Sequence, residues 1–411
     1  MGPAPVVSSR YDSAPRHPRS HAGVAGRAAR ALTTAACALA LATGAITAAP
    51  APARADDTIT TQEYFSYYHL DQARAKGYTG KGVTIALIDG PVELSDPELA
   101  GANITDKSRC TIEASAEGKY HGSEMAALLV SQKYGVAPEA TLHTYQARSG
   151  ESSTAGGSCE VNGVSYDGLG LLINQAIDDG AQVISVSLGS TERDLTLKWA
   201  IARAMEEGVI ILGASGNTGK DNNDHSLGWW SGVVGVAAID LDGKPASYSS
   251  PGQGVVTTGV GGPVTVRDFD TGKTATTRGT SNSTAIVAGL MALARQKWPN
   301  ATANQLLQLL VNTGLNINPG WNPETGYGAA SISDLVNVDP SQYPDENPIA
   351  QKQGGSSPTV EEVEQFADGL VDPTGFTIAS TYVYRGTNEQ VLSNNVKTTT
   401  HLGTSPAYHR K

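Results

Sequence analysis

Short runs of consecutive apolar residues recur along the middle of the chain, each five to seven residues long. They are apolar on both faces rather than at every second position, which is typical of strands in a parallel sheet covered on both sides. The runs are Val83–Ile88, Thr141–Ala147, Val183–Leu188, Val209–Gly213 and Val233–Ile239. The pattern therefore predicts a mostly parallel central sheet.

Segments with helical periodicity separate and follow these runs. Leu169–Asp178 and Asp194–Glu207 lie between predicted strands, and such alternation predicts βαβ units with right-handed crossovers. A longer helix is expected from Ser281 to Lys297, and its first half, Ser283–Ala294, is apolar or small nearly all round and should be buried. Another helix is expected at Ala303–Thr313. The predicted fold class is α/β, with helices on both faces of the sheet.

Composition divides the chain into four parts. After an export segment at residues 1–55, a short aromatic arm at residues 56–77 precedes the folded core at residues 78–338. Past that point the sequence is rich in Pro, Ser, Thr, Asn and Gln, so residues 339–411 are expected to form a loosely packed tail. Within the tail, Thr359 and Glu362 form a capping-box pattern that predicts the start of a helix.

The first 55 residues have the pattern of a signal peptide. A basic leader precedes an apolar, Ala-rich stretch from Ala31 to Ala49, and the small-x-small site Ala53-Arg54-Ala55 follows it. We expect cleavage after Ala55, which would make the protein secreted and leave the mature chain without a transmembrane anchor. The alternative is a membrane anchor, but Ala and Thr make the stretch only weakly apolar.

The acidic character of the chain excludes two classes of partner. The formal net charge is −11 at pH 7, and residues 1–55 hold six Arg and one Asp, so the part beyond them has a net charge of −16. Such a protein is a poor candidate for binding nucleic acid or an anionic membrane surface. We expect a monomer.

Cys110 and Cys159 remain after removal of the signal segment. An exported protein meets an oxidising environment, and both residues lie in polar, loop-like sequence, so we expect a disulfide between them. Closing a loop of about 50 residues would add roughly 3–4 kcal/mol of stability. The alternative is a pair of free thiols.

Two residues at the ends of predicted elements have catalytic potential. Asp89 ends the apolar run Val83–Ile88, and the carboxyl edge of a parallel sheet is where open α/β folds place their ligands. His121, followed by Gly122 at the start of the helical run Glu124–Val130, is exposed enough to titrate. Taken alone, Asp89 is more often a turn or cap residue and His121 a structural histidine.

Two further residues are suited to an oxyanion. Ser281 introduces the buried helix, where free N–H groups and the positive end of the helix dipole suit a developing negative charge. Asn217, in a Gly-rich segment after an apolar run, carries an amide able to donate to the same charge. Taken alone, Ser281 is more often an N-cap residue and Asn217 a turn residue.

The order Asp, His, Ser, each in its own local pattern, resembles the subtilisin-like serine proteases (subtilase, peptidase S8 family), and among them those secreted by actinobacteria. The resemblance covers about residues 60–336. It is carried by Val83–Asp89, Asp96-Pro97-Glu98-Leu99, His121-Gly122-Ser123-x-x-Ala126, Gly135-Val136-Ala137-Pro138-x-Ala140, Ser187-Leu188-Gly189, Gly279-Thr280-Ser281-x-x-Thr284-Ala285-x-Val287-Ala288-Gly289 and Gly326-Tyr327-Gly328.

The resemblance implies a three-layer subtilisin-like fold and a secreted serine endopeptidase that works through an acyl-enzyme. Asp89, His121 and Ser281 would form the catalytic triad, and Asn217 would donate to the oxyanion. An extended peptide or protein substrate would pair with one strand edge and enter a pocket walled by small residues. The residues implied in substrate binding are Ser187, Leu188, Gly189, Ala214, Ser215 and Gly216. No cofactor is implied.

Departures from the family pattern lead to further expectations. Asp89-Gly90-Pro91 replaces the usual Asp-Thr/Ser-Gly, and a similar start occurs in some subtilases that mature ribosomal peptides. Residues 56–77 are too short for the chaperone-like prodomain of many members. The loop at Gln132–Tyr134 is shorter than the one that binds calcium in relatives, so no metal site is expected.

Specificity and overall role stay open at this stage. Gly163-Val164-Ser165 is a candidate for the second substrate-binding edge. The floor of the first pocket is expected at residues 222–230. Asp221, Asp224 and His225 in or beside this segment favour a substrate with a basic residue in that pocket, and the alternative is that they form a solvated acidic loop. One alternative function is a processing protease for a single partner, with residues 149–162 as an exosite. Another is a catalytically inactive binding protein on the same fold.

Overall fold

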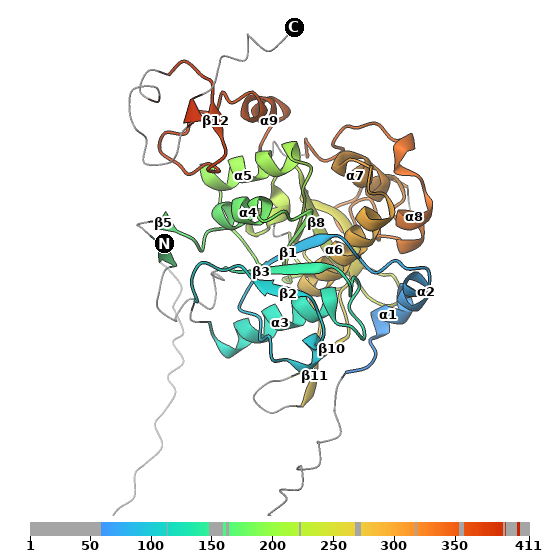
Figure 1. Ribbon diagram of the computed structural model, residues 1–411. Helices are drawn as coiled ribbons and strands as arrows, with labels where there is room; N and C mark the ends of the chain where they lie inside the picture. Colours follow the sequence, from blue (N-terminus) through green and yellow to red (C-terminus); the bar gives the residue numbers. More distant parts are fainter. Residues whose placement is uncertain are drawn as a thin grey trace, which may run out of the picture. The chain divides into compact units, whose positions relative to one another are not determined.

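A seven-stranded parallel sheet forms the centre of the computed structural model (Figure 1). The structure describes residues 59–112, 114–147, 159–161, 164–221, 223–267, 273–316, 319–352, 357–388, 391 and 401–402. In spatial order the strands are β2 (Ile104–Asp106), β3 (Thr141–Gln146), β1 (Thr84–Asp89), β6 (Val183–Val186), β7 (Ile210–Ala214), β8 (Val233–Ile239) and β9 (Val255–Val260). The prediction of a mostly parallel sheet is confirmed, because the five apolar runs became β1, β3, β6, β7 and β8.

Helices cover both faces of the sheet, as expected. In β1, Ile85 and Leu87 join a cluster with α3 (Ala116–Val130) and α6 (Thr280–Lys297), whereas Ala86 and Ile88 join one with α4 (Leu169–Asp178) and α5 (Leu195–Glu206). Successive strand residues point to opposite faces, so a run that is apolar throughout serves both layers. Figure 1 shows α4 and α5 on one side of the strands and α3 on the other.

The remaining elements are short and lie around these layers. The helices are α1 (Glu63–Tyr67), α2 (Leu70–Ala75), α7 (Ala303–Asn312), α8 (Ile332–Asn337) and α9 (Val360–Ala367), with 3₁₀ turns η1 (Pro97–Leu99), η2 (Asn223–His225), η3 (Leu227–Trp229) and η4 (Pro340–Gln342). The small sheets pair β4 (Glu160–Val161) with β5 (Val164–Ser165), β10 (Val264–Arg267) with β11 (Thr274–Thr277), and β12 (Val383–Tyr384) with β13 (His401–Leu402). None of the described helices is long and apolar enough to cross a membrane.

Helix α3 corrects one expectation. It begins at Ala116, capped by the Ser115 side chain, so His121 lies inside the helix rather than at its start. The glycine after the histidine has another cause: a Cβ at Gly122 would collide with the carbonyl oxygen of Gly90. Gly122 therefore allows α3 to approach the loop after β1, and with it His121 approaches Asp89.

The aromatic arm packs into the core more closely than the sequence indicated. The Tyr64 side chain is fully buried and its hydroxyl donates to the carbonyl of Tyr134 at 2.8 Å. The Tyr68 hydroxyl accepts from the backbone N–H of Val260, in β9, at 3.0 Å. These contacts join α1 and its following turn to the loop after α3 and to the sheet.

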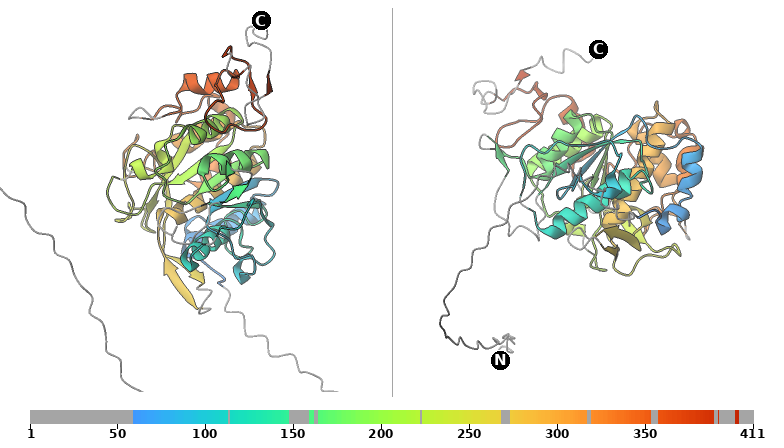
Figure 2. Two further views of the ribbon diagram at one scale, coloured as in Figure 1. Left: turned by 90° about the vertical axis from the view of Figure 1, so that its left-hand side faces the viewer. Right: turned by 60° about the horizontal axis from the view of Figure 1, so that its bottom comes forward.

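The described part of the C-terminal segment is also packed, where a loose tail was expected. The capping box of Thr359 and Glu362 is confirmed at the start of α9. Phe366 in that helix stacks on Trp199 of α5, with ring centroids 6.4 Å apart, and the Tyr382 ring lies 5.0 Å from that of Phe366 in the same cluster. Figures 1 and 2 show this segment lying along α5. Burying Trp199 requires this cover, which a composition-based boundary does not reveal.

Lys352 attaches the segment between α8 and α9 to the sheet. Its Nζ donates to the carbonyls of Gly228 and Val233, both at 2.5 Å, and of Gly254 at 3.2 Å. These carbonyls come from η3, β8 and the turn before β9. A single side chain thus donates to acceptors from three parts of the chain.

The structure joins Cys110 to Cys159, with Cα atoms 5.7 Å apart. Cys159 is buried, and its carbonyl accepts from the N–H of Tyr166 at 2.7 Å. The Arg109 guanidinium lies 4.3 Å from the centre of the Tyr166 ring. The bridge therefore ties the segment after β2 to the segment that carries β4 and β5.

Candidate active site

The candidate catalytic residues meet at the carboxyl ends of neighbouring strands. Ile88 of β1 pairs with Val186 of β6, which pairs in turn with Gly213 of β7. Asp89 follows Ile88 and Ser187 follows Val186, so parallel pairing of these two strands brings Asp89 and Ser187 to the same edge of the sheet. A carboxyl edge of this kind is the usual ligand-binding edge of an open α/β sheet.

Asp89 and His121 form a hydrogen-bonded pair, with Oδ1 and Nδ1 2.7 Å apart. The Asp89 side chain is 1% exposed and that of His121 31%. Burial lowers the pKa of His121, but the charge of Asp89, its hydrogen bond and the charges of Glu124 and Glu117 outweigh burial and raise the pKa to about 9. His121 is therefore largely protonated at neutral pH and must lose that proton before it acts as a base.

Only one of the two oxygens of the Asp89 carboxylate accepts hydrogen bonds from the described residues. Oδ1 accepts from both His121 and the N–H of Gly90, the latter at 2.7 Å. Oδ2 is buried and accepts no hydrogen bond from any residue that the structure describes. Gly90 carries no hydroxyl, so the residue after the aspartate has no side chain with which to reach this oxygen.

Ser281 lies in the first turn of α6, and its hydroxyl points to the end of β6. Its Oγ donates to the carbonyl of Ser187 at 3.0 Å, and the Ser187 hydroxyl donates back to the carbonyl of Ser281 at 3.1 Å. Within the described chain no hydrogen bond joins the Ser281 hydroxyl to His121. The structure thus brings Asp89 and His121 together and holds Ser281 in an orientation in which its proton is given to Ser187.

Asn217 is anchored to the same helix end. Its Oδ1 accepts from the N–H of Thr280 at 2.8 Å and from the Thr280 hydroxyl at 3.0 Å. Because the amide oxygen is engaged, the orientation of the side chain is set and the NH₂ group is left to donate elsewhere. Asn217 is exposed, as an oxyanion donor must be to meet a substrate.

The residues expected to bind substrate form two segments beside these groups. Ser187, Ala214 and Ser215 are buried, Leu188 and Gly216 are half-buried and Gly189 is exposed. The N–H of Gly216 donates to the Thr280 hydroxyl at 3.2 Å, so this segment is tied to the start of α6. The exposed end of the first segment, at Gly189, remains an edge on which a peptide can pair.

The acidic segment after β7 is solvated. The Asp224 side chain is 83% exposed and that of His225 58%. Arg193, which the sequence analysis did not single out, donates to the Asp224 carbonyl at 2.9 Å and lies 4.6 Å from the centre of the Trp229 ring. A cation already stands here, so the geometry favours the solvated acidic loop over a pocket for basic residues. Gly163, Asn222 and residues 149–158 and 162 lie outside the described residues.

Glu124 is a second group that the sequence analysis missed. It follows His121 by three residues, which places both on neighbouring turns of one helix face. Its carboxylate accepts from the Thr277 hydroxyl, which in turn accepts from the Asn282 amide at 3.2 Å. Burial raises the pKa of Glu124. Only the spacing from His121 was available as a signal in the sequence.

Within the described ranges, no group of three or more His, Cys, Asp and Glu side chains is arranged to hold a metal ion. An acid–imidazole pair beside a serine at a helix amino terminus is the arrangement used for nucleophilic acyl transfer.

Comparison with known proteins assigns the chain to a family. Residues 80–328 match the family model described as subtilase family, Peptidase S8. The chain is 32% identical over 255 residues to a thermostable alkaline protease of Halalkalibacterium halodurans, covering 60% of this chain and 66% of that protein. It is 28% identical over 259 residues to subtilisin DY of Bacillus licheniformis, covering 61% and 90%.

Among solved structures, the prenylagaramide maturation protease PagA shares the fold, with a TM-score of 0.53 and 24% identity, covering 65% of this chain and 96% of that one. The three-layer α/β prediction is thereby confirmed.

Proposed function

The chain belongs to the subtilase family, and on that premise we propose that it is a secreted serine endopeptidase whose catalytic triad is Asp89, His121 and Ser281. The observation that carries the proposal is the 2.7 Å pair of Asp89 and His121 beside a serine at the amino terminus of the buried helix α6. A peptide or protein is the substrate.

The proposed reaction follows from which side-chain atoms of these residues already form hydrogen bonds and which are left to meet the substrate. Asp89 holds Nδ1 of His121, so Nε2 is the nitrogen left to take the proton of Ser281 as its oxygen attacks the scissile carbonyl. The Asn217 amide and the backbone N–H of Ser281 receive the oxyanion. His121 then gives its proton to the leaving amine, and water releases the acyl group by the reverse sequence.

Substrate binding supplies a reason for Ser281 to change partner. An extended peptide that pairs with residues 187–189 offers a backbone N–H to the Ser187 carbonyl, which now accepts from Ser281. Once that acceptor is taken, the Ser281 hydroxyl turns to the imidazole of His121. The resting orientation therefore keeps the nucleophile from reacting until a peptide is in place.

The test is labelling and cleavage with the secreted chain and a Ser281→Ala control. We expect a fluorophosphonate probe to label Ser281 in the unaltered chain and not in the variant, and a peptide library to be cleaved by the former alone. Equal labelling or equal cleavage of the two proteins would exclude Ser281 as the nucleophile. Absence of both in the unaltered chain would favour the inactive binding protein.

A processing protease for one partner is the second candidate. It is favoured by the Asp89-Gly90-Pro91 start and by a short arm whose Tyr64 and Tyr68 are used in the core, which leaves no separate chaperone-like prodomain between residues 56 and 77. The likeness in fold to a maturation protease points the same way. Broad cleavage of a denatured protein such as casein would exclude this candidate.

Secretion is proposed from the leader at residues 1–55, which lies outside the described residues. The bridge between Cys110 and Cys159 supports it, because disulfides persist in oxidising compartments. Amino-terminal sequencing of the protein recovered from the medium is expected to begin at Asp56. A start at Met1 would contradict removal of the leader. The resemblance to subtilases secreted by actinobacteria is a separate point, and an actinobacterial origin stays a prediction.

A further inference from the structure

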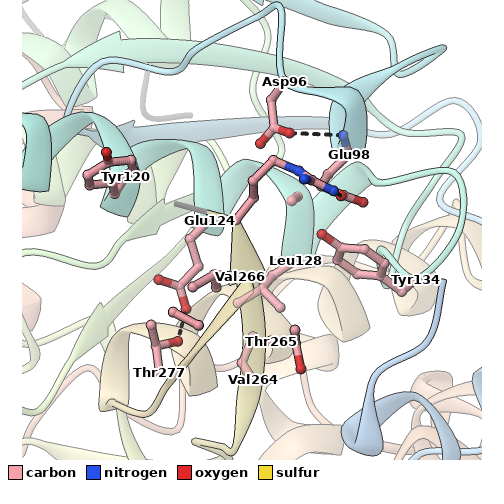
Figure 3. Close-up of a pocket in the computed structure, with 13 residues that line it drawn as sticks. Asp96, Glu98, Tyr120, Glu124, Leu128, Tyr134, Val264, Thr265, Val266 and Thr277 are labelled. Carbon is pink, nitrogen blue, oxygen red and sulfur yellow. Dashed lines mark hydrogen bonds and ion pairs between the residues drawn. The ribbon is translucent and has the colours of Figure 1, made fainter. Parts of the chain in front are cut away.

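A cavity of about 230 Å³ lies between α3 and the β10–β11 hairpin (Figure 3). Its apolar wall is made by Leu128 of α3 and by Val264 and Val266 of β10. The rings of Tyr120 and Tyr134 stand on either side of it in Figure 3. This volume is below the roughly 300–1,000 Å³ of pockets that enclose drug-sized ligands, so it suits a single side chain.

The polar part of the cavity is acidic. Asp96, Glu98 and Glu124 line it together with Arg267, whose Nη2 donates to Glu98 Oε1 at 2.9 Å. Burial is the largest influence on the pKa of Asp96 and of Glu124, and it raises both. One guanidinium therefore faces three carboxyl groups, and two of these are held in surroundings that disfavour their charge.

Glu98 adds an independent sign of a missing ligand. Its side chain is 2% exposed, and Oε1 accepts from Arg267 and from the N–H of Ile59 at 3.0 Å. Its other oxygen, Oε2, is buried and accepts no hydrogen bond from the residues that the structure describes. A buried carboxylate oxygen without a donor is costly, and a cationic donor entering the cavity would relieve that cost.

The cavity shares its walls with the catalytic elements. Glu124 stands one helical turn after His121, and Thr277, which donates to Glu124, precedes Ser281 by four residues. Figure 3 shows the Glu124–Thr277 hydrogen bond at one edge of the cavity. The cavity is therefore lined by residues of the same helix as His121 and of the strand that leads into the helix of Ser281.

We propose that the cavity between α3 and the β10–β11 hairpin is a subsite for a lysine or arginine side chain of the polypeptide that the protease cleaves. The aliphatic stem lies against the valines of β10, and the cationic head donates to the carboxylates. The inference rests on the proposed peptidase function. It places the preference for basic residues here rather than at the solvated segment after β7.

The first experiment tests the cavity without catalysis. The Ser281→Ala protein is titrated with n-pentylamine, which has the lysine side chain together with its α-carbon, and with the uncharged n-pentanol, and binding is followed by NMR. We expect n-pentylamine to bind at least ten-fold more tightly, because a charged hydrogen bond is lost in the alcohol. Equal affinities, or binding of neither compound, would overturn the proposal.

Variants locate the binding. Ala275 is an exposed residue of β11 that lines the cavity, so Ala275→Trp fills it in a strand that tolerates aromatic residues, and Ala275→Ser is the matched control. We expect n-pentylamine binding to be lost in the first and kept in the second. Should Ala275→Trp not fold, Asp96→Asn keeps the cap on Glu98 and removes the charge; it should weaken n-pentylamine binding several-fold. Binding unchanged by these variants would place it elsewhere.

The second experiment ties the cavity to the substrate. Lysine is moved position by position through a cleaved peptide and compared with norleucine at each position. We expect one position at which lysine raises kcat/KM at least ten-fold, and we expect this gain to vanish in Ala275→Trp, which still cleaves the norleucine peptide. Amine binding without any such position, or a preference that survives in Ala275→Trp, would overturn the proposal. Failure of the unaltered chain to cleave any peptide would instead remove the proposed function.

Discussion

Two regions of the molecule use polar groups in opposite ways. One is the catalytic edge, where Asp89, Asn217 and Ser281 lie. The other is the seat of the C-terminal segment, where Lys352 and Glu362 attach that segment to the rest of the protein. At the catalytic edge, Asp89 Oδ2 accepts no hydrogen bond from the described residues, and the Asn217 amide is held by its oxygen alone. At the seat, Glu362 accepts from the Lys198 ammonium at 2.6 Å, from the Ser357 hydroxyl at 2.9 Å and from the N–H of Thr359 at 2.8 Å. The hydrogen-bonding capacity of the carboxylate is partly unused at Asp89 and is used at Glu362.

The difference separates groups kept for a substrate from groups that hold the fold together. Unused capacity lowers stability, and a folded protein tolerates it where a ligand later supplies the partner. We therefore expect substitutions at the catalytic edge to reduce rate with little effect on stability. Substitutions at the seat should do the reverse.

The largest effect is expected from Ser281→Ala. Loss of the nucleophile should lower kcat by a factor on the order of 10⁶, while the single bond lost to Ser187 should change the free energy of unfolding by about 1 kcal/mol. Steady-state kinetics and urea denaturation measure the two. Ser283→Ala is the control, because Ser283 also donates to a strand carbonyl, that of Gly259 at 3.0 Å, yet should keep its rate. Similar rates in both variants would contradict the expectation that Ser281 is needed for the reaction and Ser283 is not.

Asn217→Ala should have the next largest effect. Removal of one oxyanion donor typically lowers kcat by about 10²–10³, and KM should change little because the oxyanion forms only in the transition state. Asn103→Ala, which removes an exposed amide bonded to the Thr141 hydroxyl, is the control and should keep its rate. A raised KM with unchanged kcat would show that Asn217 binds the ground state instead.

The pH dependence should span about two orders of magnitude. The base must be neutral, and the pKa of His121 is raised to about 9, so kcat/KM should rise about ten-fold per pH unit below that value and level off above it. Between pH 7 and 9 the gain is about 50-fold, because half of the imidazole is still protonated at its pKa, and the full gain of about 10² is reached on the plateau above. Rates in overlapping buffers at constant ionic strength provide the measurement. A plateau already reached at pH 7 would show that the imidazole is not held protonated by Asp89.

When the expected effects are all expressed as free energies, the smallest is that of Lys352→Met at the seat. The variant leaves the carbonyls of Gly228, Val233 and Gly254 without this donor, which should lower the free energy of unfolding by about 1–3 kcal/mol. Thermal and urea denaturation measure the loss, with the exposed Lys81→Met as control. The rate on a good peptide at low temperature should be unchanged. A loss of rate that exceeds the loss of folded protein would show that the two regions are coupled.

Local patterns were enough for the framework of this protein. The runs that became β1, β3, β6, β7 and β8 were visible because a parallel strand covered on both sides carries apolar residues on both of its faces. The order of Asp89, His121 and Ser281 was readable for a similar reason, since each residue sits in a short segment whose pattern is set by its neighbours in the chain. The capping box of α9 depends only on residues three apart.

Contacts between distant segments were decided by the tertiary structure alone. The bond from Thr277 to Glu124, the exchange between Ser187 and Ser281, and the stacking of Phe366 on Trp199 join residues more than 90 positions apart. No local pattern encodes such pairs, because they depend on how helices pack on the sheet and at what depth. For the same reason the sequence indicated Asp89, His121 and Ser281 as candidate catalytic residues. Only packing determined that the Ser281 hydroxyl donates to Ser187 and that an acidic cavity lies along the helix that carries His121.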